Sequence, residues 1–396
     1  MHQKKYTRKR KGGKAIGSGG FGCIFRPALN CTSHKYKKQS RKKVSKLGLK
    51  YSVEREMHQL LLVKKYIKKI SNYKKYFLLN NIDTCRPAPL TKKDKVGFDK
   101  CFTLKEHNIT EKTVNDNLQH LMIINMPYGG VSLSKVIEKS KLSFGTINKM
   151  LQRLLLFAIL PMNKLNVYHL DLKADNILYK DSLLKIIDFG EIGISTNSEP
   201  LPSIGHRPIQ FNSPFSNILF SDYMNSVINA FLHKTNKSDP KLYKKLRNVI
   251  KLAYESIQQS NRGHELYLVK YVLPNMLKIV SYQTDLETLL NKMIVDYCTK
   301  AVYNYIDFKR KTFDKVKYFN DVYSKNVDVY GWIMCYVDFI VTWKTATGND
   351  IYNDSSKKTK LAIMHIIMEF CFSDKYAARH IPIDALLGAL NSIDSK

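Results

Sequence analysis

Three oxygen-bearing side chains occur close together in the middle of the chain, at a spacing that could support phosphoryl transfer. Asp171 and Asn176 lie five positions apart in the segment HLDLKADN, and Asp188 follows in DFG after the apolar run LLKII. Phosphoryl transfer needs a carboxylate that orients the attacking hydroxyl, and hard oxygen ligands that hold Mg²⁺ against the phosphates. Asp171 suits the first task, whereas Asn176 and Asp188 suit the second. A hairpin of NILY and LKIID would bring Asn176 and Asp188 side by side; the alternative is that all three are ordinary turn residues.

A glycine cluster near the N-terminus could approach phosphate groups. The segment GSGGFG at 17–22 fits the pattern G-x-G-x-x-G, and glycines allow positive φ and a close approach of backbone N–H groups to phosphate oxygens. A dinucleotide-binding fold would need a helix directly afterwards and an acidic residue further on. Here CIFRPA has the composition of a strand, and Lys and Arg dominate the residues that follow. The pattern therefore predicts a β-hairpin that covers phosphates, or else a plain glycine-rich turn.

In this order and combination, the motifs resemble those of eukaryotic-type protein kinases, from about Ala15 to the C-terminus. The resemblance implies an α+β, bilobal protein-kinase-like fold, with a small β-rich N-lobe and a larger helical C-lobe. It implies that Asp171 is the catalytic base, and that Asn176 and Asp188 bind the Mg²⁺ that accompanies ATP. Lys173 stands where Ser/Thr-directed kinases carry a lysine, so the resemblance favours Ser/Thr over Tyr as the acceptor.

The kinase resemblance also indicates which residues contact ATP. VSKL resembles the V-A-I-K strand, in which alternation places Val44 and Lys46 on one face, with Lys46 reaching the phosphates and Lys43 as the fallback. Glu56 is the expected helix partner of Lys46, in preference to Glu54, because its neighbours face the core. INMPYGG resembles the hinge that binds adenine through backbone groups. The expected ATP-binding residues are Ile16, Gly17, Gly19, Gly20, Gly22, Ile24, Val44, Lys46, Met126 and Tyr128.

Two later segments resemble parts of a kinase C-lobe. DVYGW at Asp328–Trp332 resembles the beginning of the helix that anchors the catalytic loop, and AARHIPIDALLGAL, which contains Arg379, resembles the last helix of the family. The interval between DFG and DVYGW is longer than the family normally uses. We therefore expect a helical insertion at about 221–310, which could bind substrate, a partner or a membrane, or could buttress the C-lobe.

The chain departs from the family pattern at two places near the site. Leu170 replaces the Arg of H-R-D, so a phosphorylated activation loop would lack its usual arginine partner, and we expect activity that does not require such phosphorylation. An A-P-E motif is absent, and SPFS at 213–216 is the segment that could replace it.

The expected organisation is a disordered basic tail at 1–14, an N-lobe at 15–124 and a C-lobe at 125–396. IGSGGFGCIFRPALNC, VSKL, HLDLKADN, DFG and QFNSPFSNILF together resemble the Ser/Thr kinases of nucleocytoplasmic large DNA viruses. These include mimivirus-like and iridovirus-like enzymes and, more distantly, the poxvirus virion-assembly kinase. This resemblance implies virion or host protein substrates, and a location in the virion, the host cytoplasm or both.

The composition is strongly basic, with 65 Lys and Arg against 33 Asp and Glu and a formal net charge of +32. Such a charge favours polyanionic partners, namely acidic protein, anionic lipid or nucleic acid, although codon bias in an A+T-rich genome would produce the same composition. No apolar run reaches the roughly 18 residues that span a bilayer. The basic N-terminus has no apolar core of a signal peptide.

The cysteines point to a reducing environment. All seven are scattered and none forms a CxxC pair, so we expect reduced thiols, no disulfide scaffold and no zinc site. The cysteines are Cys23, Cys31, Cys85, Cys101, Cys298, Cys335 and Cys371.

Three other functions remain open at this point. A pseudokinase scaffold would use the basic surface and the insertion to bind partners, but Asp171, Asn176 and Asp188 are all present. A lipid or small-molecule kinase would share H-x-D-x-x-x-x-N, but the glycine loop and Lys173 favour a protein substrate. Nucleic-acid binding as the main role is the weakest alternative, because no zinc finger, aromatic platform or basic recognition helix is evident.

Overall fold

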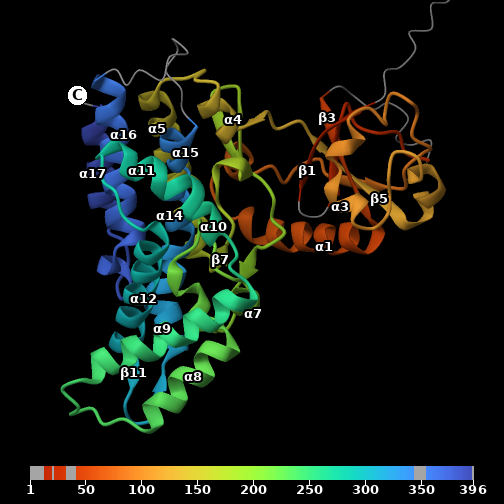
Figure 1. Cartoon of the computed structure of the whole chain (residues 1–396). Helices are drawn as coiled ribbons and strands as arrows, with labels where there is room; N and C mark the ends of the chain where they lie inside the picture. Colours follow the sequence, from red (N-terminus) through yellow and green to blue (C-terminus); the bar gives the residue numbers. More distant parts are fainter. Residues whose placement is uncertain (1–12, 20–21, 33–41, 343–353, 395–396) are drawn as a thin grey trace, which may run out of the picture. The chain divides into compact units, whose positions relative to one another are not determined.

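The computed structural model describes residues 13–19, 22–32, 42–342 and 354–394. The chain is an α+β protein, as predicted, in which an N-terminal five-stranded antiparallel sheet is followed by a largely helical region (Figure 1). It forms two compact units. Unit 1 comprises Met1–Lys65 and Leu78–Gly130, and unit 2 comprises Tyr66–Phe77 and Val131–Lys396. Within the described residues, no helix has the length and apolar character needed to cross a membrane.

Unit 1 is built on a sheet whose strands are arranged in the order β1-β2-β3-β5-β4. Successive side chains of a strand point to opposite faces. Leu47 of β3 therefore lies with Phe25 and Ile123 in a buried apolar core, whereas its neighbour Lys46 faces the other side. The strands are β1 (Lys14–Gly19), β2 (Gly22–Arg26), β3 (Lys43–Leu49), β4 (Asp83–Cys85) and β5 (Leu121–Pro127).

Helical segments complete unit 1. Phe98, Leu104 and Val114 belong to the same apolar core as the strand residues, and each comes from a short helix. These helices are η2 (Phe98–Lys100), α3 (Phe102–Lys105) and η3 (Val114–His120). The longer helix α1 (Lys50–Ile67) begins directly after β3, so the end of β3 sets its starting position. This direct connection fixes where the first turns of α1 lie relative to Lys46.

The expectation of reduced thiols is wrong for four of the seven cysteines. Two disulfides join Cys23 to Cys101 and Cys31 to Cys85, with Cα–Cα distances of 5.0 and 5.8 Å, within the range that a disulfide requires. The paired residues are 78 and 54 positions apart in the sequence. The tertiary fold of unit 1 brings them together, and for that reason the absence of a CxxC motif was uninformative. The cysteines of unit 2, Cys298, Cys335 and Cys371, are free and buried.

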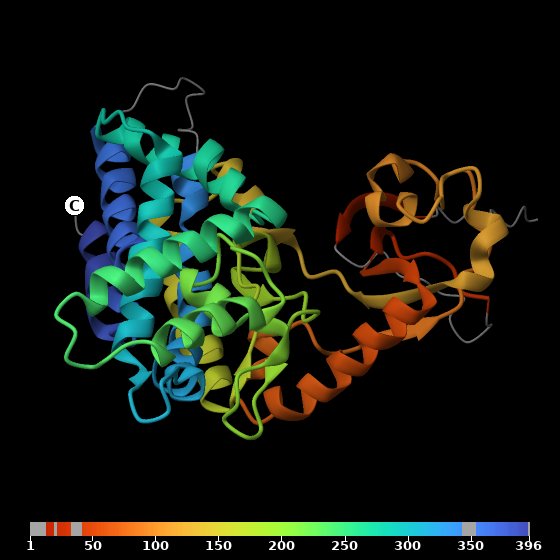
Figure 2. The same ribbon diagram turned by 60° about the horizontal axis from the view of Figure 1, so that its bottom comes forward.

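Unit 2 is mainly helical, and α14 (Ser324–Met334) is buried along nearly its whole length. In the segment at about 221–310, α9 (Leu242–Ser260) packs against α8 (Asp222–His233) and α12 (Leu286–Asn304), which lie together in Figure 2. The expected insertion thus contains several helices that pack on one another. The remaining helices of unit 2 are α2 (Tyr73–Tyr76), α4 (Leu133–Glu138), α5 (Phe144–Leu154), η4 (Leu155–Ile159), α6 (Leu160–Lys164), η5 (Ala174–Asn176), α7 (Pro202–Gly205), η6 (Phe215–Phe220), α10 (Glu265–Tyr267), η7 (Leu268–Val272), α11 (Leu273–Ile279), α13 (Lys315–Tyr318), η8 (Phe319–Tyr323), α15 (Val337–Val341), α16 (Asp354–Ile367), η9 (Met368–Phe372), η10 (Asp374–Tyr376) and α17 (Ile383–Asp394).

Short strands in unit 2 carry the motif-bearing segments. A three-stranded sheet has the order β6-β8-β9, β7 pairs with β10, and β11 pairs with β12. The loop with HLDLKADN therefore runs from β7 to β8, and DFG follows β9. The strands are β6 (Val131–Ser132), β7 (Val167–Tyr168), β8 (Ile177–Lys180), β9 (Leu183–Ile186), β10 (Gly193–Ile194), β11 (Ile306–Asp307) and β12 (Thr312–Phe313).

Candidate functional site

The loop that carries Asp171 is anchored by Asp328 of the buried helix α14. The Asp328 carboxylate is fully buried and accepts hydrogen bonds from the backbone N–H groups of His169 at 2.8 Å and Leu170 at 2.9 Å. It also accepts one from the Asn163 side-chain amide at 2.7 Å. Hydrogen bonds to a charged acceptor are stronger than neutral ones. The helix that DVYGW was expected to mark thus holds the loop, although it begins at Ser324, one turn earlier.

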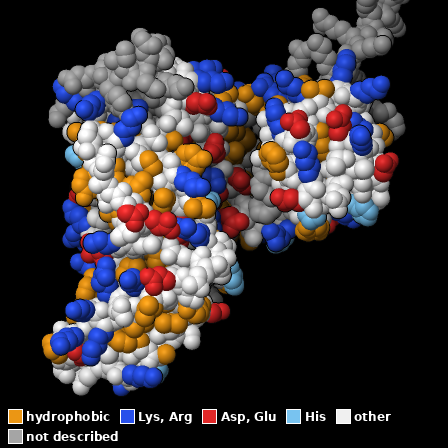
Figure 3. Space-filling view, in the orientation of Figure 1, with side chains coloured by type: hydrophobic (Ala, Val, Ile, Leu, Met, Phe, Trp, Pro, Cys, Tyr) orange, Lys and Arg blue, Asp and Glu red, His pale blue; other side chains and the backbone are white. Residues whose placement is uncertain are grey.

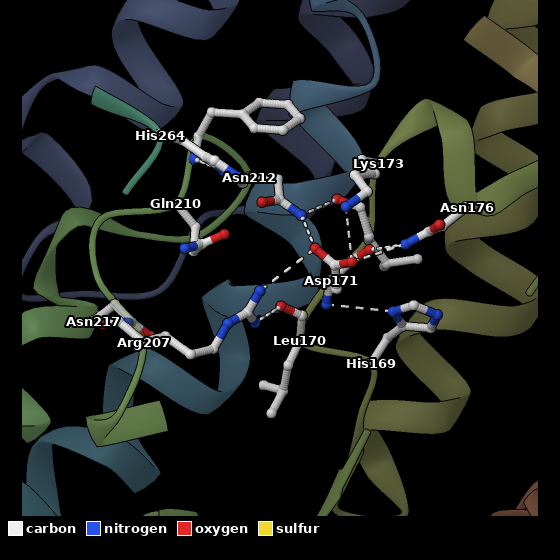
Figure 4. A network of polar contacts seen from close by, with 12 residues as sticks. His169, Leu170, Asp171, Lys173, Asn176, Arg207, Gln210, Asn212, Asn217 and His264 are labelled. Carbon is white, nitrogen blue, oxygen red and sulfur yellow. Dashed lines mark hydrogen bonds and ion pairs between the residues drawn. The ribbon is translucent and has the colours of Figure 1, made fainter. Parts of the chain in front are cut away.

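Asp171 lies at the centre of a network of donors (Figure 4). Its Oδ2 accepts hydrogen bonds from Lys173 Nζ and from Asn176 Nδ2, both at 2.9 Å. Its Oδ1 accepts one from Asn212 Nδ2 at 2.9 Å and lies 3.5 Å from Arg207 Nη2. Because both oxygens are engaged, the plane of the carboxylate is fixed. Lys173 and Asn176, which the sequence singles out, thus contact Asp171 directly.

The surroundings of Asp171 favour its ionised form. Burial alone would raise the pKa of the Asp171 carboxyl, but the charge of Lys173 and the hydrogen bonds from Asn212 and Lys173 outweigh burial and hold it below its usual range. The carboxylate is therefore deprotonated at neutral pH. Such a group is a weak proton acceptor but a strong hydrogen-bond acceptor, which suits it to orienting a hydroxyl.

His169 and Phe189 connect the two Asp-centred motifs. The fully buried His169 accepts a hydrogen bond from the Asp171 backbone N–H at Nδ1, 3.3 Å away, and Nε2 donates to the Ile187 carbonyl oxygen at 2.9 Å. The Phe189 ring, also buried, lies 5.5 Å from the His169 ring and 6.5 Å from that of Phe77. Ile187, which precedes DFG, and Phe189, within DFG, thus both contact His169 of the HLD turn.

The structure contains the hairpin expected to bring Asn176 and Asp188 together. In the β8–β9 pair Ile177 lies opposite Ile186, and the Ile187 N–H donates to the Asn176 carbonyl oxygen at 3.0 Å. Asp188 is the next residue and adopts a left-handed backbone conformation, with φ of 62°. Its backbone therefore lies beside that of Asn176.

Asn176 and Asp188 retain unused oxygen atoms. The Asn176 amide nitrogen donates to the Asp171 carbonyl at 2.8 Å as well as to the carboxylate, and among the described residues no hydrogen bond reaches Oδ1. Within the part of the chain that the structure describes, the Asp188 carboxylate has no hydrogen bond or ion pair, and it is only partly buried. An amide oxygen and a carboxylate are hard ligands of the type that Mg²⁺ prefers, so the residues present fit this metal.

In unit 1, Lys46 and Glu56 form a buried ion pair. Lys46 Nζ lies 2.8 Å from both carboxylate oxygens of Glu56, and the two side chains are 6% and 9% exposed. Lys43, the fallback candidate, instead contacts Asp83 at 2.8 Å and is more exposed. A buried lysine held by a carboxylate is a defined point charge that could meet a phosphate group.

Several expected nucleotide-binding side chains lie on the face of the sheet that carries Lys46. Ile24 is directly opposite Lys46 in the β2–β3 pair, and Met126 is opposite Val44 in the β3–β5 pair. Residues opposite one another in antiparallel strands project to the same side. The backbone N–H of Tyr128, by contrast, donates to the Lys42 carbonyl at 2.7 Å. Tyr128 and Met126 mark the end of β5, where the hinge is expected.

The described glycines of the cluster lie on β1 and β2, which pair as the hairpin that the sequence predicts. Gly19 pairs with Gly22, and a β-bulge lies between Ala15 and Gly17. A Cβ at Gly22 would lie 2.5 Å from the Leu47 carbonyl oxygen, so no side chain fits there. Ile16 on β1 is exposed, whereas Gly20 lies outside the described residues.

Two residues that the sequence interpretation did not assign complete the Asp171 network. Asn212 is 1% exposed and donates to the Leu172 carbonyl at 3.0 Å as well as to Asp171. Arg207 donates to the Leu170 carbonyl at 2.5 Å. Both follow Asp171 by more than 35 positions, and nothing in their local sequence indicates the contact. Only QFNSPF, as part of a family resemblance, drew attention to this region.

No protein-family model matches the chain, and no curated protein matches its sequence. The functional interpretation therefore depends on the geometry described above. Unit 2 brings together Asp171, Lys173 and Asn176 and places Asp188 next to Asn176. Unit 1 brings together Lys46 and Glu56 and aligns apolar side chains beside them.

Proposed function

We propose that the chain is a protein serine/threonine kinase that transfers the γ-phosphoryl group of ATP to protein substrates, and that its two units are the lobes of a protein-kinase-like fold. The observation that carries the proposal is the Asp171 cluster. An ionised carboxylate is held by a lysine and an asparagine, and the backbone of that asparagine lies beside that of Asp188, whose carboxylate has no hydrogen bond or ion pair among the described residues. This combination supplies both a hydroxyl acceptor and metal ligands within one loop and one hairpin.

In this proposal each residue has a separate task. Asp171 accepts a hydrogen bond from the substrate hydroxyl and orients its oxygen toward the γ-phosphorus. Lys173, 2.9 Å from Asp171, neutralises charge that develops on the transferred group. Lys46, fixed by Glu56, binds phosphate oxygens of ATP. Catalysis of phosphoryl transfer depends mainly on such positioning and charge stabilisation.

The proposed metal ion is Mg²⁺. Asn176 and Asp188 would hold it through the Asn176 Oδ1 and the Asp188 carboxylate, and when bound it neutralises negative charge on the ATP phosphates. The hydrogen bonds of the Asn176 amide nitrogen to Asp171 fix which atom of the amide is available.

The acceptors under this proposal are proteins that a basic surface attracts. Lys and Arg side chains are spread over the face shown in Figure 3, with fewer Asp and Glu between them, and the chain as a whole carries a net charge of +32. Long-range attraction of this kind accelerates encounters with acidic partners and weakens as salt increases. We include virion and host proteins among the proposed substrates, on the resemblance to viral kinases.

The direct test is transfer of a radiolabelled γ-phosphate from Mg²⁺-ATP to a mixture of Ser- and Thr-containing proteins. Asp171→Asn should reduce the rate by at least about 10³-fold, because the carboxylate is the hydroxyl acceptor. Asp175→Asn is a matched control, since Asp175 lies in the same loop but is exposed, and it should retain activity.

Each alternative predicts a different outcome of this assay. Binding of Mg²⁺-ATP without any transfer would favour a pseudokinase and would end the proposal. Label that enters lipids or small molecules but no protein would favour a small-molecule kinase. Transfer to protein that is unaffected by Asp171→Asn would show that the activity does not come from this site.

A further inference from the structure

We propose that Arg207 is a positioning residue for the loop that carries Asp171, and that the inserted helical segment orders the stretch 209–211, between Arg207 and Asn212, without phosphorylation. This inference rests on the proposed kinase function, because it assigns a role to the loop that contains the catalytic carboxylate. It also assigns a role to the inserted segment at about 221–310, which the sequence left open.

The backbone of Leu170 is held from both sides by charged groups. Its N–H donates to Asp328 Oδ1 at 2.9 Å, and its carbonyl oxygen accepts a hydrogen bond from Arg207 Nη1 at 2.5 Å. Leu170 has φ of 63°, a left-handed conformation that is unfavourable for a residue with a Cβ. Such a conformation persists where its surroundings over-determine it. Arg207 and Asp328 provide that constraint one residue before Asp171.

The side chain of Leu170 is unavailable for the task that an arginine would perform at this position. It is 3% exposed, and a Cβ added at Gly193 would lie 3.3 Å from its Cδ1 and closer still to Leu201. Leu170 is therefore a core residue packed among apolar neighbours. The guanidinium group beside Asp171 comes instead from Arg207, which follows it by 36 positions.

The backbone of Arg207 is fixed within unit 2. Its carbonyl oxygen accepts a hydrogen bond from Asn217 Nδ2 at 3.0 Å, and the same amide reaches the Ile204 carbonyl at 3.3 Å. Asn217 is 2% exposed, and its Oδ1 accepts a hydrogen bond from the Tyr323 hydroxyl at 2.7 Å. The direction in which the Arg207 side chain leaves the backbone is thus set by buried groups.

The loop between α9 and α10 packs directly on the segment that contains Arg207 and Asn212. The His264 N–H donates to the Ile209 carbonyl at 2.8 Å, and the Phe211 N–H donates to His264 Nδ1 at 3.4 Å. Gly263 has φ of 54°, and a Cβ there would lie 2.3 Å from the same Ile209 oxygen. The Phe211 ring also lies 5.0 Å from that of Tyr267. Two peptide groups and one ring are therefore held by the insertion.

That loop is itself braced by a buried carboxylate. Glu265 has no exposed surface, and its Oε2 accepts hydrogen bonds from Gln258 at 2.8 Å and from Arg262 at 3.2 Å. Arg262 also contacts Glu287 of α12 at 2.6 Å. Burial, together with the nearby positive charge of Lys173, lowers the pKa of His264, so its ring stays neutral and Nδ1 remains an acceptor for Phe211.

A phosphate in an activation loop normally orders that loop by pairing with arginines. Here backbone hydrogen bonds and ring contacts from the insertion hold Ile209 and Phe211, Asn217 holds the backbone of Arg207, and the Arg207 side chain already reaches the Asp171 loop. Ordering of the segment at 207–212 therefore requires no added phosphate charge. It works through Arg207 and Asn212, which touch Asp171, whereas His264 and Gly263 act through them.

The test uses the phosphatase-treated full chain, and its substitutions are Arg207→Ala, Arg207→Lys and Gly263→Ala. Arg207→Ala should lower kcat by about 10²-fold, with KM for ATP changed by less than about threefold, because the loop is misplaced but the nucleotide site is not. Arg207→Lys keeps the charge but loses the planar guanidinium group, so its kcat should lie between those of the wild type and Arg207→Ala. Added guanidinium ion should restore part of the activity of Arg207→Ala, and Gly263→Ala should lower kcat about tenfold.

Matched controls are available for both positions. Arg310 is an exposed arginine whose side chain is 80% accessible, so Arg310→Ala should leave kcat unchanged. Gly388 has no atom within 4 Å of an added Cβ, so Gly388→Ala should also leave kcat unchanged. An unchanged kcat in Arg207→Ala, or loss of wild-type activity after phosphatase treatment, would overturn the proposal.

A second readout is independent of catalysis. Hydrogen exchange of the backbone amides at 167–176, followed by mass spectrometry, should become at least about tenfold faster in Arg207→Ala and remain unchanged in Arg310→Ala. If the wild-type chain transfers no phosphate, the proposed function fails, yet this measurement still decides whether Arg207 positions the loop. Unchanged exchange in Arg207→Ala would refute that role even in an active kinase.

Discussion

The three hydrogen bonds to Asp328 allow a prediction about how firmly the Asp171 loop is held. Asp328→Ala removes the acceptor for the N–H groups of His169 and Leu170 and for the Asn163 amide. Asp328 and His169 have no exposed surface, so water cannot readily replace the lost acceptor. We expect the substitution to destabilise unit 2 and to release the start of the loop.

The size of the effect follows from the number of donors. An unsatisfied buried donor costs about 1 to 3 kcal/mol, which places the loss for three donors between about 3 and 9 kcal/mol. Removing the carboxylate also removes the cost of burying its charge, so we expect Asp328→Ala to lower the free energy of unfolding by about 4 kcal/mol. Asp328→Asn retains one acceptor oxygen but turns an NH₂ group toward donors, and should cost about 2 to 3 kcal/mol. A typical domain has only about 5 to 15 kcal/mol of stability in total.

Urea unfolding followed by tryptophan fluorescence is the appropriate assay. Trp332 belongs to unit 2 and is buried in the same helix as Asp328, whereas the second tryptophan of the sequence, Trp343, lies outside the described residues. At a slope of about 3 kcal/mol per molar urea, the midpoint should fall by more than about 1 M. Asp374→Ala, at an exposed ion pair with Lys300, is the control and should change stability by less than about 0.5 kcal/mol. A midpoint for Asp328→Ala within about 0.2 M of wild type would refute the reasoning.

Three further predictions concern both units. Reduction of the two disulfides, whose loops span 78 and 54 residues, should destabilise unit 1 by up to about 4 kcal/mol per bridge and leave the tryptophan transition in place; a shift of that transition alone would contradict this. Lys46→Met leaves Glu56 buried without its partner and should cost unit 1 about 3 kcal/mol and abolish phosphate transfer, whereas an active variant would contradict the ATP assignment. Burial, together with the carboxylates of Asp175 and Glu138, raises the pKa of Asp338 to about 6. Between about pH 4 and 6 the folded chain therefore holds a proton on Asp338 that the unfolded chain has lost, and the free energy of unfolding falls as the pH rises through this range. Asp338→Asn should therefore add roughly 3 kcal/mol at neutral pH and almost nothing below pH 4, and equal gains at both pH values in urea titrations would disprove the assignment.

The sequence predicted which side chains lie close together where they share a hairpin or a strand and the helix after it, because such arrangements depend on local periodicity. The five-residue spacing of Asp171 and Asn176 and the short hairpin before Asp188 leave little freedom, and the structure contains that hairpin. Strand alternation and the helix that follows β3 placed Lys46 and Glu56 within reach of each other, and the two side chains are in contact. Lys46 and Glu56 are ten positions apart in the chain and are joined by one strand and the helix that follows it, so local secondary structure brings such groups together.

The disulfides show why local patterns failed elsewhere. Cys23 lies on β2 and Cys101 lies between two short helices, and both belong to the apolar core of unit 1. Spacing rules for cysteines detect clusters that are close in sequence, whereas this pairing depends on how the helices pack against the sheet. The sequence therefore predicted the opposite redox state for this unit.

The sequence by itself determined the α+β class of the protein and the identity of the groups that could perform chemistry, because residue type and short spacing are local properties. The tertiary structure alone decided which distant groups hold those residues: Arg207 and Asn212 reach Asp171, and His264 holds the segment between them. Asp328 was indicated by resemblance, but its three hydrogen bonds appear only in the fold. Contacts between residues far apart in the chain depend on which elements pack together, and hydrophobic periodicity marks a buried face without indicating its partner.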